Sequence, residues 1–136
     1  MRIFLDANVL FSAAKSDGAI RRLLALLAEA GHECHADTYV VEEARRNLAL
    51  KAPGNLPVLD RLVARIHVAQ IKASLAEAEA VRSLPEKDRP VLAAAIDLRC
   101  QALVTGDRTH FGTLYGKTVG GVTIHSPRSL AEALLT

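Results

Sequence analysis

Short apolar runs alternate along this chain with longer stretches in which Leu, Ala, Val and Ile recur at helical spacing. The short runs predict buried strands at 2–5, 32–36, 66–71, 102–105 and 122–125. The longer stretches predict helices at 8–14, 18–30, 38–50, 58–65, 74–83, 86–99 and 127–135. Strands that alternate with helices pair in parallel. The pattern therefore predicts an α/β fold, a three-layer α/β/α sandwich whose central, mostly parallel sheet has about five strands.

The composition is that of an ordinary globular domain, and at 136 residues we expect a single domain over 1–136. A net charge of +2 neither requires nor excludes a nucleic-acid partner. No apolar run is long enough to span a membrane, and Asp6 interrupts the one segment that could serve as a signal peptide. We therefore expect a cytoplasmic protein in which Cys34 and Cys100 are free thiols.

Two aspartates follow predicted strands directly. Asp6 comes after the strand at 2–5, and Asp107 follows the strand at 102–105 after one glycine. In a parallel sheet both strand ends lie at the same edge, where ligands bind if the strand order reverses. Either aspartate could instead cap the helix that follows it, so this position alone leaves both interpretations open.

Two predicted helices add one acidic side chain each. In the helix at 38–50, Glu43 lies at the border of the apolar face, whereas Glu42 points outward and can pair with Arg46. In the helix at 86–99, Asp88 projects onto the centre of the buried face. Asp88 faces a site or caps its own helix ahead of Pro90.

These four carboxylates would repel one another if they met without a counter-ion. A divalent cation removes the conflict, and a site of carboxylates suits Mg²⁺ or Mn²⁺. Such a site leaves coordination positions for water and phosphate oxygens. Hydrolysis of a phosphodiester bond is the reaction that this set of residues suits best.

The order FLDANVLFSA, TYVVEEARRNL, KDRPVLAAAIDLRCQALVTGDRTHF and GVTIHSP resembles the PIN domain family over essentially the whole chain. The resemblance implies a ribonuclease that depends on Mg²⁺ or Mn²⁺ and has a central parallel sheet. Many bacterial and archaeal members are toxins of toxin–antitoxin pairs, so the resemblance also implies RNA as substrate, a small antitoxin protein as partner, and a homodimer. The exposed parts of the helices at 18–30 and 38–51 are the expected surface for that partner.

The resemblance assigns residues as well. The catalytic and metal-binding acids would be Asp6, Glu43, Asp88 and Asp107, and the polar helpers that orient an acid or contact the substrate would be Asn8 and Thr105. The family often has a further acid after Asp107, but here the sequence continues RTHF, which leaves a second metal position open.

An arginine and a histidine follow Asp107. Arg108 could bind an RNA phosphate or form a surface ion pair, and His110 could approach the site or be solvated.

Parts of the sequence suggest three other functions. His32, Cys34 and His35 cannot all face one zinc ion from a single strand, because side chains alternate. A catalytically degenerate PIN scaffold that binds RNA or a protein without cleavage is the main alternative. A phosphoaspartate enzyme of the haloacid dehalogenase type would need a second Asp where this chain has Asn8.

Overall fold

One sheet organises the structure. The computed structural model describes residues 1–70 and 89–136, and within these residues six strands form a sheet of order β3-β2-β1-β4-β6-β5. The strands are β1 (Arg2–Leu5), β2 (Glu33–Asp37), β3 (His67–Ala69), β4 (Ala102–Val104), β5 (Thr118–Val119) and β6 (Val122–His125). All neighbouring strands are parallel except β5, which pairs antiparallel with β6. The predicted α/β fold with a mostly parallel sheet is confirmed.

The strand order reverses next to β1. The chain moves outward from β1 to β2 and β3, and it then returns to the other side of β1 as β4 and β6. The carboxyl ends of β1 and β4 therefore lie side by side where the connections depart in opposite directions, and ligands bind at this kind of point in open α/β sheets.

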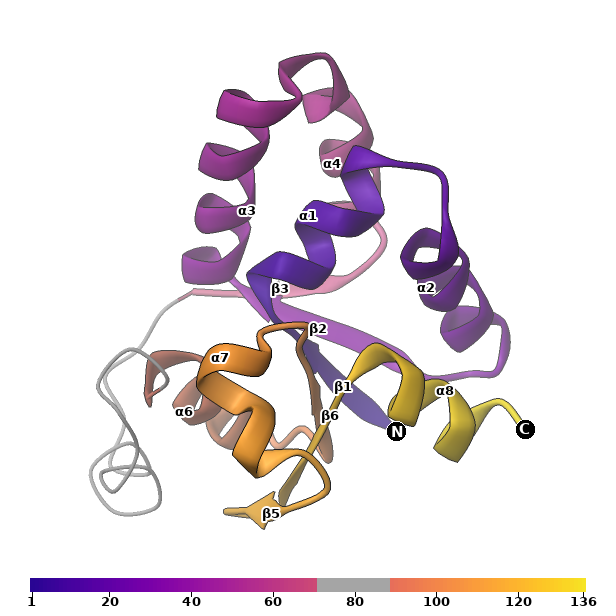
Figure 1. Cartoon of the computed structure of the whole chain (residues 1–136), viewed down its shortest axis with the longest axis vertical. Helices are drawn as coiled ribbons and strands as arrows, with labels where there is room; N and C mark the ends of the chain where they lie inside the picture. Colours follow the sequence, from indigo (N-terminus) through magenta and orange to yellow (C-terminus); the bar gives the residue numbers. More distant parts are fainter. Residues whose placement is uncertain (71–88) are drawn as a thin grey trace.

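Helices lie on both sides of the strands. They are α1 (Ala7–Lys15), α2 (Ala19–Glu29), α3 (Thr38–Lys51), α4 (Leu56–Val63), α6 (Arg89–Asp97), α7 (Arg108–Phe111) and α8 (Pro127–Leu134), with short 3₁₀ turns η1 (Pro53–Asn55) and η2 (Gly112–Leu114). Figure 1 shows α1 to α4 in the upper part of the molecule and α6 and α7 in the lower part, with strands between them. Helix α1 packs against α2, α3 and α4.

Apolar side chains of the central strands form the core. Ile3, Phe4 and Leu5 of β1 and Leu103 of β4 are completely buried. Because both faces of the sheet are covered, these strands are continuous apolar runs without alternating polar residues. This explains why the strand at 2–5 could be predicted from an uninterrupted apolar run in the sequence.

Element boundaries differ from the prediction by one or two residues. The helix predicted at 58–65 begins at Leu56, because Pro57 is compatible with a first helical turn. Helix α2 ends at Glu29, and Gly31 follows with φ of +87°. Asp37 caps α3 by accepting a hydrogen bond from the backbone N–H of Val40 at 3.0 Å.

The other predictions on local structure concern two helices, the two cysteines and membrane-spanning segments. The helix predicted at 74–83 and the start of that at 86–99 lie outside the described residues. Cys34 and Cys100 are free and buried, and burial raises the pKa of each thiol to about 11. No described helix combines the length and the apolar composition that a membrane crossing needs.

Candidate functional site

Three of the four predicted acids line one cleft. The cleft has a volume of about 700 Å³ and is lined by residues that follow β1 and β4 and by residues of α1, α3, α6 and α7. Its lining consists of Asp6, Ala7, Asn8, Phe11, Tyr39, Glu43, Asn47, Lys51, Val91, Gly106, Asp107, His110 and Phe111. The predicted fourth acid, Asp88, lies outside the described residues.

Asp6 is the most buried of these acids, with 5% of its surface exposed. Its Oδ1 accepts a hydrogen bond from the backbone N–H of Ala7 at 2.7 Å, so Asp6 caps α1. Its Oδ2 accepts bonds from the Thr105 hydroxyl at 2.8 Å and the Asn8 amide at 3.2 Å. Burial raises the pKa of Asp6, and the nearby Asp107 raises it further, against these hydrogen bonds. Asp6 is thus a helix cap and also lines the cleft.

Thr105 and Asn8 connect the ends of β1 and β4. Besides its bond to Asp6, the Thr105 hydroxyl accepts hydrogen bonds from the backbone N–H of Asp107 at 3.1 Å and from the Asn8 amide at 3.3 Å. The Asn8 carbonyl oxygen accepts a bond from the backbone N–H of Gly106 at 2.8 Å. A Cβ at position 106 would come within 3.3 Å of that oxygen, so Gly106 permits the close approach. Both predicted helpers therefore hold acids in position.

Asp107 is held by the helix that it caps. Its Oδ1 accepts a hydrogen bond from the backbone N–H of His110 at 3.1 Å, and its Oδ2 lies 2.6 Å from the His110 Nδ1. Partial burial raises the pKa of Asp107, but the bonds from His110 outweigh this effect and the net pKa is lowered. His110 is therefore part of the site's structure, whereas the sequence left its position open.

Glu43 enters the cleft from α3, while Glu42 is exposed to solvent, as the helical phase predicted. Burial raises the pKa of Glu43, and the negative charges of Asp6 and Asp107 raise it further. Asp6 thus feels the charge of Asp107, and Glu43 feels the charges of both aspartates, so these charges oppose the ionisation of Asp6 and Glu43.

These residues fit a hard divalent cation. The three acids offer carboxylate oxygens, and the neighbouring side chains in contact with Asp6 are a hydroxyl and an amide. Oxygen donors of this kind suit Mg²⁺ or Mn²⁺. A bound cation would also offset the burial and the mutual repulsion that raise the pKa values of Asp6 and Glu43.

One face of α3 contributes more to the cleft than the sequence analysis expected. Tyr39, Glu43, Asn47 and Lys51 recur every four residues, and all four line it. The i, i+4 spacing is readable in the sequence, but only Glu43 of these four residues was predicted to belong to the site. Tyr115 was also missed, and its hydroxyl donates a hydrogen bond to the backbone carbonyl of Thr105 at 2.8 Å. That contact depends on the path of the chain after α7.

Two further predictions concern neighbouring side chains. Arg108 is exposed at the start of α7 beside Asp107. His32, Cys34 and His35 do not converge on one point, as expected, and within the described part of the chain a different set of ligand-type side chains does so.

Comparisons with known proteins agree with this architecture. One similar structure is VapBC2 from Rickettsia felis bound to a DNA fragment from the VapBC2 promoter. It gives a TM-score of 0.71 at 18% identity, over 93% of this chain and 98% of that one. DNA-bound VapBC from Salmonella typhimurium gives 0.66 at 17% identity, over 93% and 98%. At these identities the likeness concerns the fold alone.

A third solved structure and a family model complete the comparison. Mycobacterium tuberculosis VapC20, described as a toxin that cleaves the sarcin–ricin loop, gives a TM-score of 0.59 at 15% identity, over 86% of this chain and 98% of that one. No curated protein sequence gives a significant match. The model of the PIN domain matches residues 2–109, most of the chain. The chain therefore belongs to the PIN domain family.

Proposed function

We propose that this protein is a ribonuclease that hydrolyses RNA phosphodiester bonds with Mg²⁺ or Mn²⁺. The observation that carries the proposal is the meeting of Asp6, Glu43 and Asp107 in one cleft at the point where the strand order reverses. Membership of the PIN domain family supports the same reaction, and the likeness to VapC proteins agrees with it.

In this proposal Asp6, Glu43 and Asp107 hold the ion, with Asp88 as the fourth acid that the sequence resemblance adds. The ion, when bound, supplies activation of the attacking water and offsets charge that develops on the phosphate. Thr105 and Asn8 hold the Asp6 carboxylate in one orientation through bonds of 2.8 and 3.2 Å. His110 does the same for Asp107. These contacts preorganise the acids, so little reorganisation is needed when the substrate arrives.

RNA is the proposed substrate because the cleft combines acids with cationic side chains at its border. Lys51 lines the cleft and Arg108 is exposed next to it, so either can pair with a phosphate that flanks the scissile bond. The sarcin–ricin loop named for VapC20 is a structured RNA, which makes a structured RNA the first substrate to test.

A cleavage assay tests the proposal. Purified protein incubated with structured RNA and Mn²⁺ should produce discrete fragments, and an excess of chelator should abolish them because the acids alone cannot offset the charge on the phosphate. Added back, Mn²⁺ or Mg²⁺ should restore cleavage. Cleavage that persists in chelator would contradict the metal-dependent mechanism.

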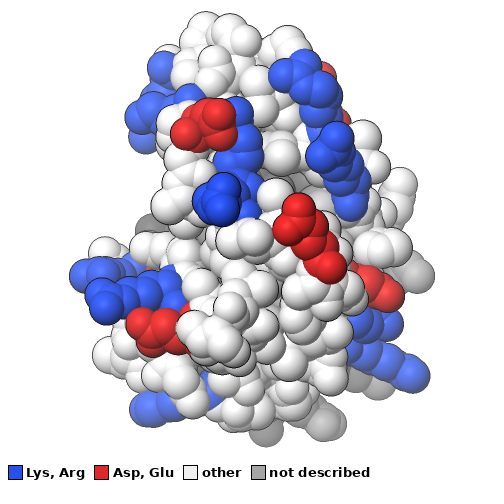
Figure 2. Space-filling model, turned by 90° about the vertical axis from the view of Figure 1, so that its right-hand side faces the viewer, with Lys and Arg blue, Asp and Glu red and all other residues white. Residues whose placement is uncertain are grey.

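We also propose a small antitoxin protein as partner, since two of the similar structures are VapBC complexes. From the sequence, we expected this partner to bind the exposed parts of α2 and α3. A groove of about 570 Å³, lined largely by α2, α4 and the residues that follow α4, fits a partner better, because its lining combines apolar residues of both helices with Arg21, Arg22, Arg61 and Arg65. In the upper half of Figure 2, basic side chains lie on either side of a largely uncharged strip. A segment with apolar and acidic side chains would complement this groove.

A PIN scaffold that binds RNA or a protein without cleavage is the second candidate. The specific observation in its favour is that no acid follows Asp107, where RTHF forms α7. Under this alternative the protein would bind the RNA in the assay above and leave it intact with either metal.

A further inference from the structure

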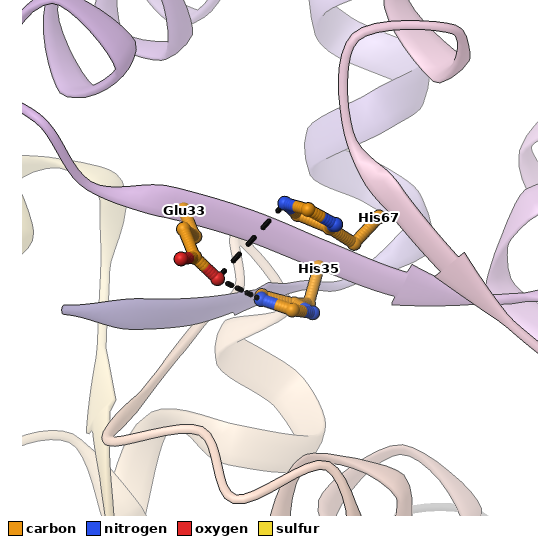
Figure 3. A group of neighbouring side chains, drawn as sticks. All are labelled: Glu33, His35 and His67. Atoms are coloured by element: carbon orange, nitrogen blue, oxygen red, sulfur yellow. Dashed lines mark hydrogen bonds and ion pairs between the residues drawn. The ribbon is translucent and has the colours of Figure 1, made fainter.

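A second group of ligand-type side chains lies on β2 and β3, away from the cleft. Glu33 and His35 are two residues apart on β2 and share a face, and His67 on β3 is the register partner of His35. In Figure 3 both imidazole rings turn a nitrogen toward the same oxygen of Glu33. Within the described residues, this is the group of three whose ligand atoms all lie within 4.8 Å of one another.

The distances in this group are close to those of a metal site. The Glu33 Oε1 lies 3.1 Å from the His35 Nε2 and 3.9 Å from the His67 Nε2. Ligand atoms about 2.0–2.1 Å from a tetrahedral zinc ion are about 3.3–3.4 Å apart. The two rings are stacked, with centroids 4.6 Å apart and an angle of 18° between their planes. The His67 side chain is 64% accessible to solvent, so its ring can tilt. The lone pairs of the His35 and His67 Nε2 atoms can then point at one ion.

Burial and charge also favour a cation at this place. The His35 side chain is only 7% exposed, so one ligand is fixed in the structure, while Glu33 and His67 remain open to solvent and give an ion access. A carboxylate and neutral imidazoles are the forms that bind metal. Arg2 is the positive charge that opposes an ion here, since its charge acts on both Glu33 and His35.

We propose that Glu33, His35 and His67 form a second metal site, which binds a transition-metal dication of the zinc type. Two imidazoles and a carboxylate suit zinc and its neighbours, whereas the all-oxygen cleft suits Mg²⁺ or Mn²⁺. The site lies toward the beginning of β2 and β3, whereas Asp6 and Asp107 of the cleft follow the ends of β1 and β4. The ion would connect the edge strand β3, which has three residues, to β2 inside the sheet.

Zinc titration of the full-length protein tests this site. Saturating Zn²⁺ should raise the Tm by about 5–10 °C, because an ion that binds only the folded chain stabilises it. His67→Ala and Glu33→Gln should each raise the Kd for Zn²⁺ about tenfold or more. Co²⁺ provides a second readout, since its visible absorption bands report imidazole ligands and should weaken in His67→Ala.

Two control variants separate this site from the rest of the chain. His32→Ala removes a nearby histidine outside the group, and Asp6→Asn removes a ligand of the proposed nuclease site; both should bind Zn²⁺ as the wild-type protein does. The proposal is overturned if the wild-type Tm does not respond to Zn²⁺, if His67→Ala keeps the wild-type affinity, or if Asp6→Asn abolishes binding. In each of those cases the three side chains are only a hydrogen-bonded and stacked cluster, or zinc binds in the cleft. Loss of RNA cleavage has no bearing on the result.

Discussion

Replacing Asp6 by Asn is expected to lower the rate of RNA cleavage by at least about 10³-fold, which corresponds to about 4 kcal/mol of transition-state stabilisation. The substitution removes the negative charge at the most buried position of the cleft and keeps an oxygen that can cap α1. The rate is measured with structured RNA at saturating Mn²⁺. The Mn²⁺ affinity should fall in the same variant.

The fold should survive this change, so that the loss can be attributed to chemistry. Because burial raises the pKa of Asp6, its contribution to stability is present at low pH and is lost as the pH rises through the folded-state pKa. Ionisation of Asp6 is therefore less favourable in the folded, metal-free protein than in the unfolded chain, and the neutral amide of Asn removes this cost. Asp6→Asn should have a metal-free Tm at neutral pH equal to or above that of the wild type.

Asp60→Asn is the matched control, since Asp60 pairs with Arg45 at 2.8 Å on the surface and lies outside the cleft. It should cleave at the wild-type rate. Cleavage by Asp6→Asn within a fewfold of wild type would remove Asp6 from the mechanism, and with it the role of the cleft as the catalytic site.

Much of the cleft follows from local sequence patterns. The apolar run before Asp6 and the strand before Asp107 are short and uninterrupted, because each strand is buried on both faces. Parallel pairing then places both acids at one edge without any further information. The helical phase of α3 separates Glu43, which lines the cleft, from the exposed Glu42. The caps at Asp6 and Asp37 were also readable, since Asp is favoured at that position.

Other features depend on the register and path of the chain, which local patterns do not contain. His35 and His67 lie 32 positions apart in the sequence, and only the alignment of β2 with β3 makes them neighbours. Helix α7 has four residues and β5 has two, too few for a recognisable period. The contact of Tyr115 with Thr105 follows from the loop after α7. Asp88 lies outside the described residues, so its role stays a prediction.

Replacing Thr105 by Val is expected to lower cleavage about 10–100-fold, although this residue need not touch the substrate. Thr105 is completely buried, and its hydroxyl joins Asp6, Asn8 and the backbone of Asp107. Val keeps the shape of Thr but leaves the backbone N–H of Asp107 without its acceptor, so the free energy of unfolding should fall by about 1–3 kcal/mol. Both quantities are measurable, by the cleavage rate at saturating Mn²⁺ and by denaturant unfolding.

Two further variants distinguish a positioning role from a general loss of stability. Thr105→Ser keeps the hydroxyl and should recover most of the cleavage rate, even though the loss of a buried methyl group lowers stability. Thr123→Val removes a hydroxyl on the neighbouring strand β6 that is hydrogen-bonded to the Thr118 hydroxyl at 2.9 Å. This variant should cleave RNA at the wild-type rate. If Thr105→Ser were as slow as Thr105→Val, the hydroxyl would not be what orients Asp6. Full activity in Thr105→Val would show that Asn8 and the cap at Ala7 hold this carboxylate without help from β4.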